Sequence, residues 1–266
     1  MVNKELWPIL GYPGNSFPKG ELRCITGTLE SNGWETPRKN WKTSTQWKIL
    51  VNDISKELKI AFQYSKGKVD WLFNFLFLLL PLPFLTKKIG NCRIHLGMWL
   101  KILNIENELM NVIREYSGKG YKIRLYGHSQ GGGMAKAAHF FIRKKGYSIE
   151  KTHTWGAPRV VSLLSNQAWV AKDIVSYESA YDIVPHVPFN FFPNGIIFAA
   201  LAVYMYLFKE YYVLTGVFSF FFFTCLYKST GTRIGPWKWY HCFMPWKWGW
   251  ILPWKWYSGH TCYGEM

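Results

Sequence analysis

The sequence predicts an α/β fold in which helices cover both faces of a mostly parallel sheet. Two observations predict this class. Strand-like and helix-like segments alternate between residues 121 and 178, and a glycine-rich turn joins the first of these strands to the first helix. The chain has 266 residues, of which 49% are hydrophobic, so it can bury a large core. We therefore expect residues 1–266 to form a single domain.

Four segments predict strands, and one predicts a long helix. The expected strands are residues 58–64 (LKIAFQY), 121–126 (YKIRLY), 151–155 (KTHTW) and 174–178 (IVSYE). Residues 130–145 predict a helix, because Met134, Ala138, Phe141 and Ile142 recur on one face, basic residues fill the last turn and Gly146 follows. A second helix is expected between the last two strands. Residues 1–57 carry turn signals and no chemistry that we identify.

The segment Gly127-His128-Ser129-Gln130-Gly131 fits the Gly-x-Ser-x-Gly pattern of a nucleophile elbow. In such an elbow the serine stands on a strained turn, and the flanking glycines let strand and helix pass closely. The pentapeptide alone is a weak signal, but here it lies between a predicted strand and a predicted helix. We therefore predict that Ser129 is a nucleophile rather than an incidental serine in a glycine-rich loop.

A serine nucleophile needs an acid and a base, which follow it in the chain order acid, then histidine. Asp173 and Asp182 are the aspartates after Ser129. Asp182 follows the strand at 174–178, at the carboxyl edge where open α/β sheets place functional groups, whereas Asp173 precedes that strand. Glu178 is a weaker candidate because it falls within the strand. The sequence thus favours Asp182 as the acid.

Three histidines follow Asp182, namely His186, His241 and His260. His186 comes only four residues after Asp182, which is too close for a side chain on a separate loop. Spacing alone does not choose between His241 and His260.

Six segments together resemble a known family, the class 3 lipases, which are α/β-hydrolases and include the fungal triacylglycerol lipases. The resemblance covers about residues 58–190 and the last few residues. The similar segments are 61–71 (AFQYSKGKVDW), 95–98 (HLGM), 126–135 (YGHSQGGGMA), 154–160 (TWGAPRV), 182–188 (DIVPHVP) and 260–263 (HTCY).

The resemblance implies roles for particular residues. It makes Asp182 the acid of the triad, and it favours His260 over His241 as the base because a tyrosine follows His260 at the family's spacing. It also implies an oxyanion hole formed by the backbone N–H of Gln130 and by Ser65. The family has Arg-Gly where this chain has Gln63-Tyr64, so the oxyanion loop is expected to differ in shape.

Two apolar regions interrupt the predicted fold. Residues 71–88 begin with WLFNFLFLLLPLPFL and are the candidate lid, the alternative being ordinary core. Residues 190–257 form a predicted insertion with apolar runs at 195–208 and 211–227 and three Pro-Trp-Lys-Trp repeats. Asp182 and His260 must meet on one side of any bilayer, so the insertion crosses it twice or not at all. Because two spans need about 40 apolar residues, we expect a shallow or surface-lying hairpin.

The formal net charge of +16 predicts an anionic partner, which is either nucleic acid or an acidic membrane face. The tryptophans beside lysines favour the membrane, so we expect no nucleic acid. The first twenty residues lack the apolar core of a cleavable signal peptide, and we expect a membrane-associated protein on the cytoplasmic side. The five cysteines include no close pair that would bind a metal, and triad chemistry needs no cofactor.

These features together predict a serine lipase or esterase that hydrolyses lipid esters at a membrane or lipid surface. The alternative is a catalytically inactive, membrane-associated protein that keeps the fold. Thioesterase and acyltransferase chemistry would use the same triad, and the sequence does not choose between triacylglycerol, phospholipid and short esters.

Overall fold

The computed structural model describes residues 22–24, 45, 47–63, 86–89, 92–162, 165, 171–179, 182, 184–186, 196–207, 214–217, 219, 227–228 and 230–235. Ser65, His241, His260, residues 71–85 of the candidate lid and the Pro-Trp-Lys-Trp repeats lie outside the described residues.

The main sheet has seven strands in the order β1-β2-β3-β6-β7-β9-β11. Five neighbouring strands, from β3 to β11, are parallel, while β1 and β2 form an antiparallel edge. This confirms the predicted mostly parallel sheet. The strands are β1 (Leu22–Cys24), β2 (Trp47–Asn52), β3 (Glu57–Phe62), β6 (Lys122–His128), β7 (Lys151–Trp155), β9 (Ile174–Tyr177) and β11 (Thr232–Ile234).

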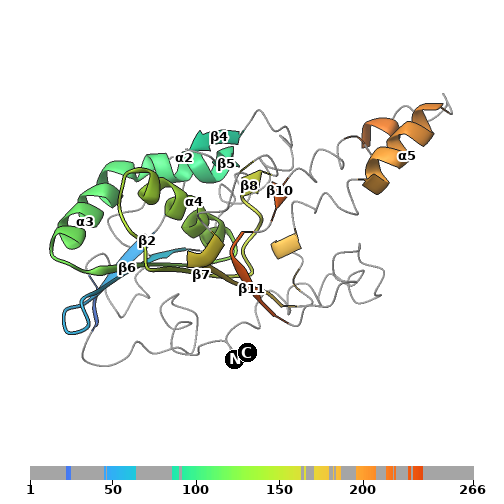
Figure 1. Ribbon diagram of the computed structural model, residues 1–266. Helices are drawn as coiled ribbons and strands as arrows, with labels where there is room; N and C mark the ends of the chain where they lie inside the picture. Colours follow the sequence, from blue (N-terminus) through green and yellow to red (C-terminus); the bar gives the residue numbers. More distant parts are fainter. Residues whose placement is uncertain are drawn as a thin grey trace.

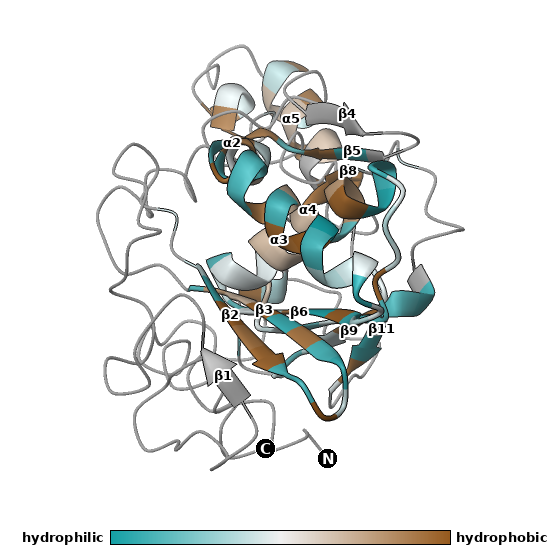
Figure 2. Cartoon of the chain, turned by 90° about the vertical axis from the view of Figure 1, so that its left-hand side faces the viewer, coloured by the Kyte–Doolittle hydropathy of each residue, from teal (hydrophilic) through white to brown (hydrophobic). Residues whose placement is uncertain are grey.

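Among the described residues, three helices lie over one face of this sheet (Figures 1 and 2). They are α2 (Leu96–Asn104), α3 (Glu106–Gly118) and α4 (Gln130–Lys144). The predicted helix at 130–145 is confirmed, but its environment differs from the expectation of one apolar face. Every α4 residue from Gln130 to Ile142 is buried. The helix lies between the sheet and α2, so it has no solvent-facing side until Arg143.

The hydrophobic core fills the space between the sheet and α4. Ile60 and Phe62 of β3 and Leu125 of β6 are fully buried there, and Trp99 of α2 packs edge-on against Phe141 of α4 with ring centroids 5.6 Å apart. Successive side chains of a strand point to opposite faces, so the neighbours of these residues lie on the other side of the sheet. That other face carries a row of stacked aromatic rings: Tyr126, His153, Trp155 and Tyr177.

The described residues also form a second, four-stranded antiparallel sheet. Its order is β10 (Tyr227–Lys228), β8 (Val161–Ser162), β5 (Cys92–His95), β4 (Thr86–Ile89). The described residues between β7 and β9 include the strand β8 and the 3₁₀ turn η4 (Ala171–Asp173), and the helix predicted in this interval falls mainly on residues 163–164 and 166–170, which lie outside the described residues. Pro158 has no backbone N–H, and the β-branched Val160 and Val161 favour extended backbone.

The region after residue 190 leaves the sheet and then returns to it. Helix α5 (Ile196–Leu207) projects away from the main sheet (orange in Figure 1), and β10 and β11 bring the chain back to the two sheets. The predicted insertion at 190–257 therefore contributes one strand, β11, to the main sheet. Within the residues that the structure describes, no helix has the length and apolar character needed to cross a membrane.

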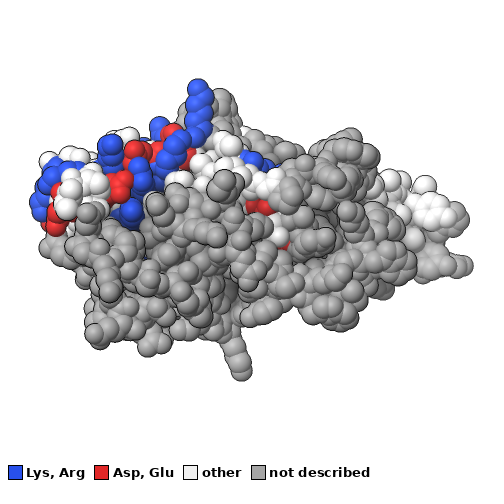
Figure 3. All heavy atoms as spheres, turned by 90° about the horizontal axis from the view of Figure 1, so that it is seen from below, with Lys and Arg blue, Asp and Glu red and all other residues white. Residues whose placement is uncertain are grey.

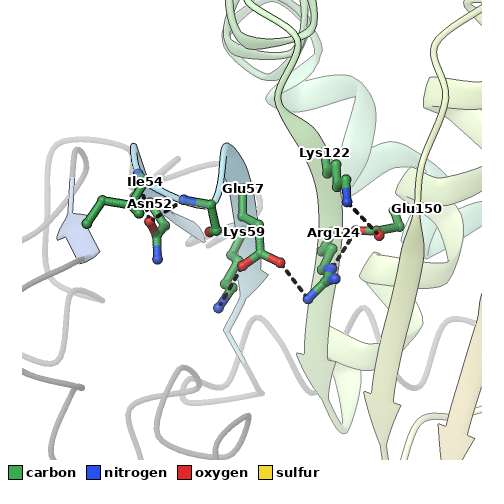
Figure 4. Close-up of polar contacts among 8 residues, drawn as sticks. Asn52, Ile54, Glu57, Lys59, Lys122, Arg124 and Glu150 are labelled. Atoms are coloured by element: carbon green, nitrogen blue, oxygen red, sulfur yellow. Dashed lines mark hydrogen bonds and ion pairs between the residues drawn. The ribbon is translucent and has the colours of Figure 1, made fainter.

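Charged side chains link the amino ends of three strands on the edge opposite the predicted elbow (Figure 4). Arg124 of β6 contacts Glu57 of β3 at 2.8 Å and Glu150, just before β7, at 2.7 Å. Asn52 Oδ1 accepts hydrogen bonds from the backbone N–H groups of Ile54 and Ser55, which closes the β2–β3 turn.

On the surface seen from below, the described basic side chains are interspersed with acidic ones (Figure 3).

Candidate active site

Ser129 occupies the turn between β6 and α4 with a strained backbone. Its φ of 54° and ψ of −127° lie in a region that side-chain-bearing residues rarely adopt, and it is one of two non-glycine residues with positive φ among those described. Two hydrogen bonds hold this turn: the Ser129 N–H donates to the Trp155 carbonyl at 2.9 Å, and the Gly133 N–H donates to the Ser129 carbonyl at 3.1 Å. The predicted strand, turn and helix are thus present, and the Ser129 side chain is half-buried.

The glycines that flank Ser129 are required by close backbone packing. A Cβ on Gly127 would lie 2.1 Å from the Gly131 carbonyl oxygen, and a Cβ on Gly131 would lie 2.3 Å from the carbonyl oxygen of Phe62. Both distances are far below van der Waals contact. Any larger residue at either position would therefore separate the strand from the helix, or the helix from β3.

The same packing places the end of β3 beside the first turn of α4. Gly131 contacts the backbone of Phe62 and Gln63, so the segment that leads to Ser65 starts next to the helix N-terminus. Gln130 is buried, and its backbone N–H is among the first of the helix, where such groups have no intrahelical partner. A helix N-terminus of this kind favours negative charge. Gln63 is buried as well, and its Nε2 has no hydrogen-bond partner among the described residues.

Asp182 lies beyond β9, at the same carboxyl edge of the parallel sheet as Ser129. β7 lies between β6 and β9, so the ends of the strands before Ser129 and before Asp182 are separated by one strand. Asp182 is fully buried, its Oδ1 accepts the Val184 N–H at 2.9 Å, and its own N–H donates to the Ser179 carbonyl at 3.2 Å. A buried carboxylate in this position is well placed to hold an imidazole.

The other two acids are engaged elsewhere. Asp173 precedes β9, at the opposite edge, and forms an ion pair with Arg143 of α4. Glu178 follows β9 but forms a bidentate ion pair with Arg233 of β11, with Nε to Oε2 at 2.9 Å. Burial raises the pKa of Glu178, although the charge of Arg233 opposes that shift. Asp173 therefore lies at the edge opposite to Ser129, and the carboxylate of Glu178 is engaged by Arg233.

None of the three candidate bases has a described side chain. His241 and His260 lie outside the described residues, and His186 is described only as the end of the 3₁₀ turn η5 (Val184–His186). His95, in the segment that resembles the family's histidine motif, is buried at the start of α2, where its Nδ1 accepts the Met98 N–H at 3.3 Å. Burial lowers the pKa of His95 to about 3, so it is a neutral helix cap.

A buried charged group that the sequence did not single out lies beside this edge. Lys136 of α4 is buried, and burial lowers its pKa to about 8, while the charge of Glu178 opposes the shift. The Glu178–Arg233 ion pair joins β11 to the end of β9 within the electrostatic reach of Lys136. A lysine in a helix predicted to have one apolar face is expected on the exposed side, so no local pattern predicts its burial.

The family model described as lipase (class 3) matches residues 59–192, which is half of the chain. This chain belongs to the class 3 lipase family. The match begins in β3 and ends beyond η5, so it includes Ser129, Gln130 and Asp182, whereas His260 lies outside it. No metal-binding cluster of His, Cys, Asp or Glu is present among the described residues.

Solved structures of fungal lipases are similar to this class 3 lipase chain. The Rhizomucor miehei triacylglyceride lipase has 18% identity and a TM-score of 0.44, with 63% of this chain and 61% of that chain covered. The mono- and diacylglycerol lipase of Aspergillus oryzae has 20% identity and a TM-score of 0.48, with 69% and 72% covered. The Lip2 lipase of Yarrowia lipolytica has 19% identity and a TM-score of 0.47, with 70% and 73% covered. The chain thus spans less than two thirds of the Rhizomucor enzyme.

Proposed function

We propose that this protein hydrolyses carboxylic ester bonds of lipids at a membrane or lipid surface, with Ser129 as nucleophile. The observation that carries the proposal is the backbone of Ser129, which is strained at φ 54° between β6 and α4. Strain of this kind costs on the order of 1–3 kcal/mol, and it collects at functional sites because it exposes a reactive group. An inactive protein would gain nothing from keeping it, which disfavours the alternative of a fold without catalysis.

The proposed chemistry divides into two steps. His260 removes the proton from the Ser129 hydroxyl as the oxygen attacks the ester carbonyl, and Asp182 holds the imidazole in the required tautomer. The negative charge that develops on the carbonyl oxygen is stabilised by the backbone N–H of Gln130 and by Ser65. His260 then returns the proton to the leaving alcohol, and water hydrolyses the acyl-enzyme by the reverse sequence.

The base assignment has a direct test in two matched variants. His260→Ala should lower ester turnover by at least about a thousandfold, a loss of the size seen when a triad member is removed, and His241→Ala should keep most of the turnover. Both variants should be checked for wild-type thermal unfolding. Loss at His241 alone, or equal loss in both variants, would contradict the assignment of His260.

The substrate class follows from one series of measurements. Turnover of esters with increasing acyl length, presented with and without anionic liposomes, should rise with length and rise further when liposomes are present. Triacylglycerol and phospholipid of the same acyl length then separate the two lipid classes. Highest turnover on short soluble esters, with no effect of liposomes, would refute a lipid-surface enzyme while leaving a serine esterase standing.

A further inference from the structure

Helix α5 presents apolar side chains to its surroundings without a polar face. Its twelve residues, IIFAALAVYMYL, include no charged side chain, and none of its described side chains is buried. Val203, Tyr206 and Leu207 are 59%, 62% and 69% exposed, respectively, and Ile196, Ile197 and Tyr204 are also exposed. At 3.6 residues per turn, these positions cover about half of the helix circumference.

The remaining half of α5 is apolar as well. Leu201, Ala202 and Met205 lie there and are half-buried. A nearby helical turn, residues 214–217, adds the exposed Leu214 and Val217. An exposed apolar surface of this extent is unusual on a soluble domain and marks an interaction site.

The absence of a polar face in α5 distinguishes between kinds of partner. A helix that docks in a protein groove inserts one apolar stripe and keeps polar residues on the side that faces water. A helix that is apolar on all sides needs an apolar medium on all sides, and its backbone is already satisfied by its own hydrogen bonds. Acyl chains supply such a medium, whereas a groove does not.

The length of α5 sets how far it reaches. Twelve residues at 1.5 Å per residue make a helix of about 18 Å, whereas the hydrocarbon core of a bilayer is about 30 Å thick. We propose that α5 inserts into the acyl layer of a single membrane leaflet and anchors the protein there. The proposal rests on the lipid-surface part of the proposed function and not on the triad.

The position of α5 in the chain connects this anchor to the catalytic sheet. α5 lies between Asp182 and β11, and β11 pairs with β9, the strand that Asp182 follows. The Glu178–Arg233 ion pair and the hydrogen bond from the Glu178 N–H to the Ile234 carbonyl at 2.9 Å join β11 to the end of β9. Insertion of α5 would therefore tether the carboxyl edge of the sheet to the leaflet through the chain on either side of α5.

Vesicle flotation with the full chain tests the anchor. The protein carries Ser129→Ala, so that binding is measured without hydrolysis. The vesicles are neutral phosphatidylcholine in about 0.5 M salt, where attraction between exposed charges is screened within a few ångströms. We expect this protein to float, and we expect Val203→Glu/Leu207→Glu to lower the partition coefficient by a factor of about 100 or more, because carboxylates resist transfer into the acyl layer.

Ile54→Glu is the matched control, because Ile54 is 77% exposed on the β2–β3 turn and lies outside α5. It should float as the parent protein does. A second measurement needs no substitution: hydroxyl-radical labelling of Tyr204 and Tyr206 should fall when vesicles are added. Full flotation of the α5 variant, or unchanged labelling of both tyrosines, would overturn the anchor.

Two further outcomes would also overturn it. If the parent protein fails to float on these neutral vesicles, the anchor is overturned, whereas the lipid-surface part of the proposed function is decided separately by turnover with anionic liposomes. If the parent is a dimer by light scattering and the α5 variant is a monomer, a second copy of the chain covers α5 instead of lipid. Ester hydrolysis by Ser129 is measured in a separate assay, and neither of these two outcomes bears on it.

Discussion

The strain at Ser129 predicts that the protein becomes more stable when the residue is replaced by glycine. Glycine adopts φ 54° and ψ −127° without a steric penalty, so Ser129→Gly releases strain on the order of 1–3 kcal/mol. Glycine also loses more backbone entropy on folding, which offsets about 0.5–1 kcal/mol. Ser129→Ala keeps its Cβ and therefore keeps the strain. We expect Ser129→Gly to unfold with a free energy about 1 kcal/mol higher than Ser129→Ala.

Urea denaturation of the two variants measures this difference, and both should be inactive toward esters. A control pair lies at Asn111, which is exposed in α3, a regular helix. There glycine should be about 1 kcal/mol less stable than alanine, the opposite sign. If Ser129→Gly is no more stable than Ser129→Ala, the elbow stores no strain and the main argument for Ser129 as nucleophile fails.

Three other predictions follow from the packing of α4 and β9. Gly131→Ala should abolish ester hydrolysis and lower stability, because its Cβ meets backbone at 2.3 Å, whereas Gly118→Ala, with nothing within 4 Å, should keep activity. His139 is buried, and its pKa of about 3 in the folded state lies below the value of 6.5 for the unfolded state. The folded state therefore loses stability as the pH falls below 6.5. In urea denaturation, the free energy of unfolding of His139→Leu should fall by about 2 kcal/mol less than that of the wild type between about pH 7.5 and pH 5. Arg233→Met should cost about 3 kcal/mol in the same assay, because it leaves the Glu178 carboxylate buried, and adding Glu178→Gln should restore part of it. An equal loss of activity in Gly131→Ala and Gly118→Ala would contradict the first prediction. A pH dependence of stability that His139→Leu leaves unchanged would contradict the second, and a double variant whose cost is the sum of the two single costs would contradict the third.

The strands nearest to the elbow were predictable because their signals are local. The segment predicted at 151–155 is β7, and the segments at 121–126 and 174–178 differ from β6 and β9 by one or two residues at their ends. The preference for Asp182 over Asp173 followed from strand direction alone. The structure places Asp173 at the opposite edge, in an ion pair with Arg143.

The elements that the sequence missed depend on distant partners. β11 is three residues long, and its partner β9 lies more than fifty residues earlier, so no local pattern marks it. β2 is an exception, because it pairs with the neighbouring β3 and its sequence, WKILVN, contains an apolar run that is a local signal for a strand. β8 takes its conformation from pairing with β5 and β10, neither of which is its neighbour in the sequence.

The site was predictable to a different degree for each residue. Ser129 and Gln130 were proposed from the contiguous elbow, where residue types at fixed spacing are enough for a prediction. The choice of His260 over His241 needed the family resemblance, because a base arrives on a loop whose length varies and whose placement depends on tertiary structure. The burial of Lys136 and Glu178 is a consequence of packing between α4, β9 and β11, which no single segment reveals.

The central claim is that Ser129 is an activated nucleophile, and covalent labelling tests it most directly. A fluorophosphonate reacts with a serine that a neighbouring base activates, and it forms a stable phosphonyl ester on that oxygen. Mass spectrometry of the full-length protein should show one adduct per chain, peptide mapping should place it on Ser129, and Ser129→Ala should remain unlabelled. Absence of an adduct on the folded wild-type protein, or an adduct that persists in Ser129→Ala, would contradict the account.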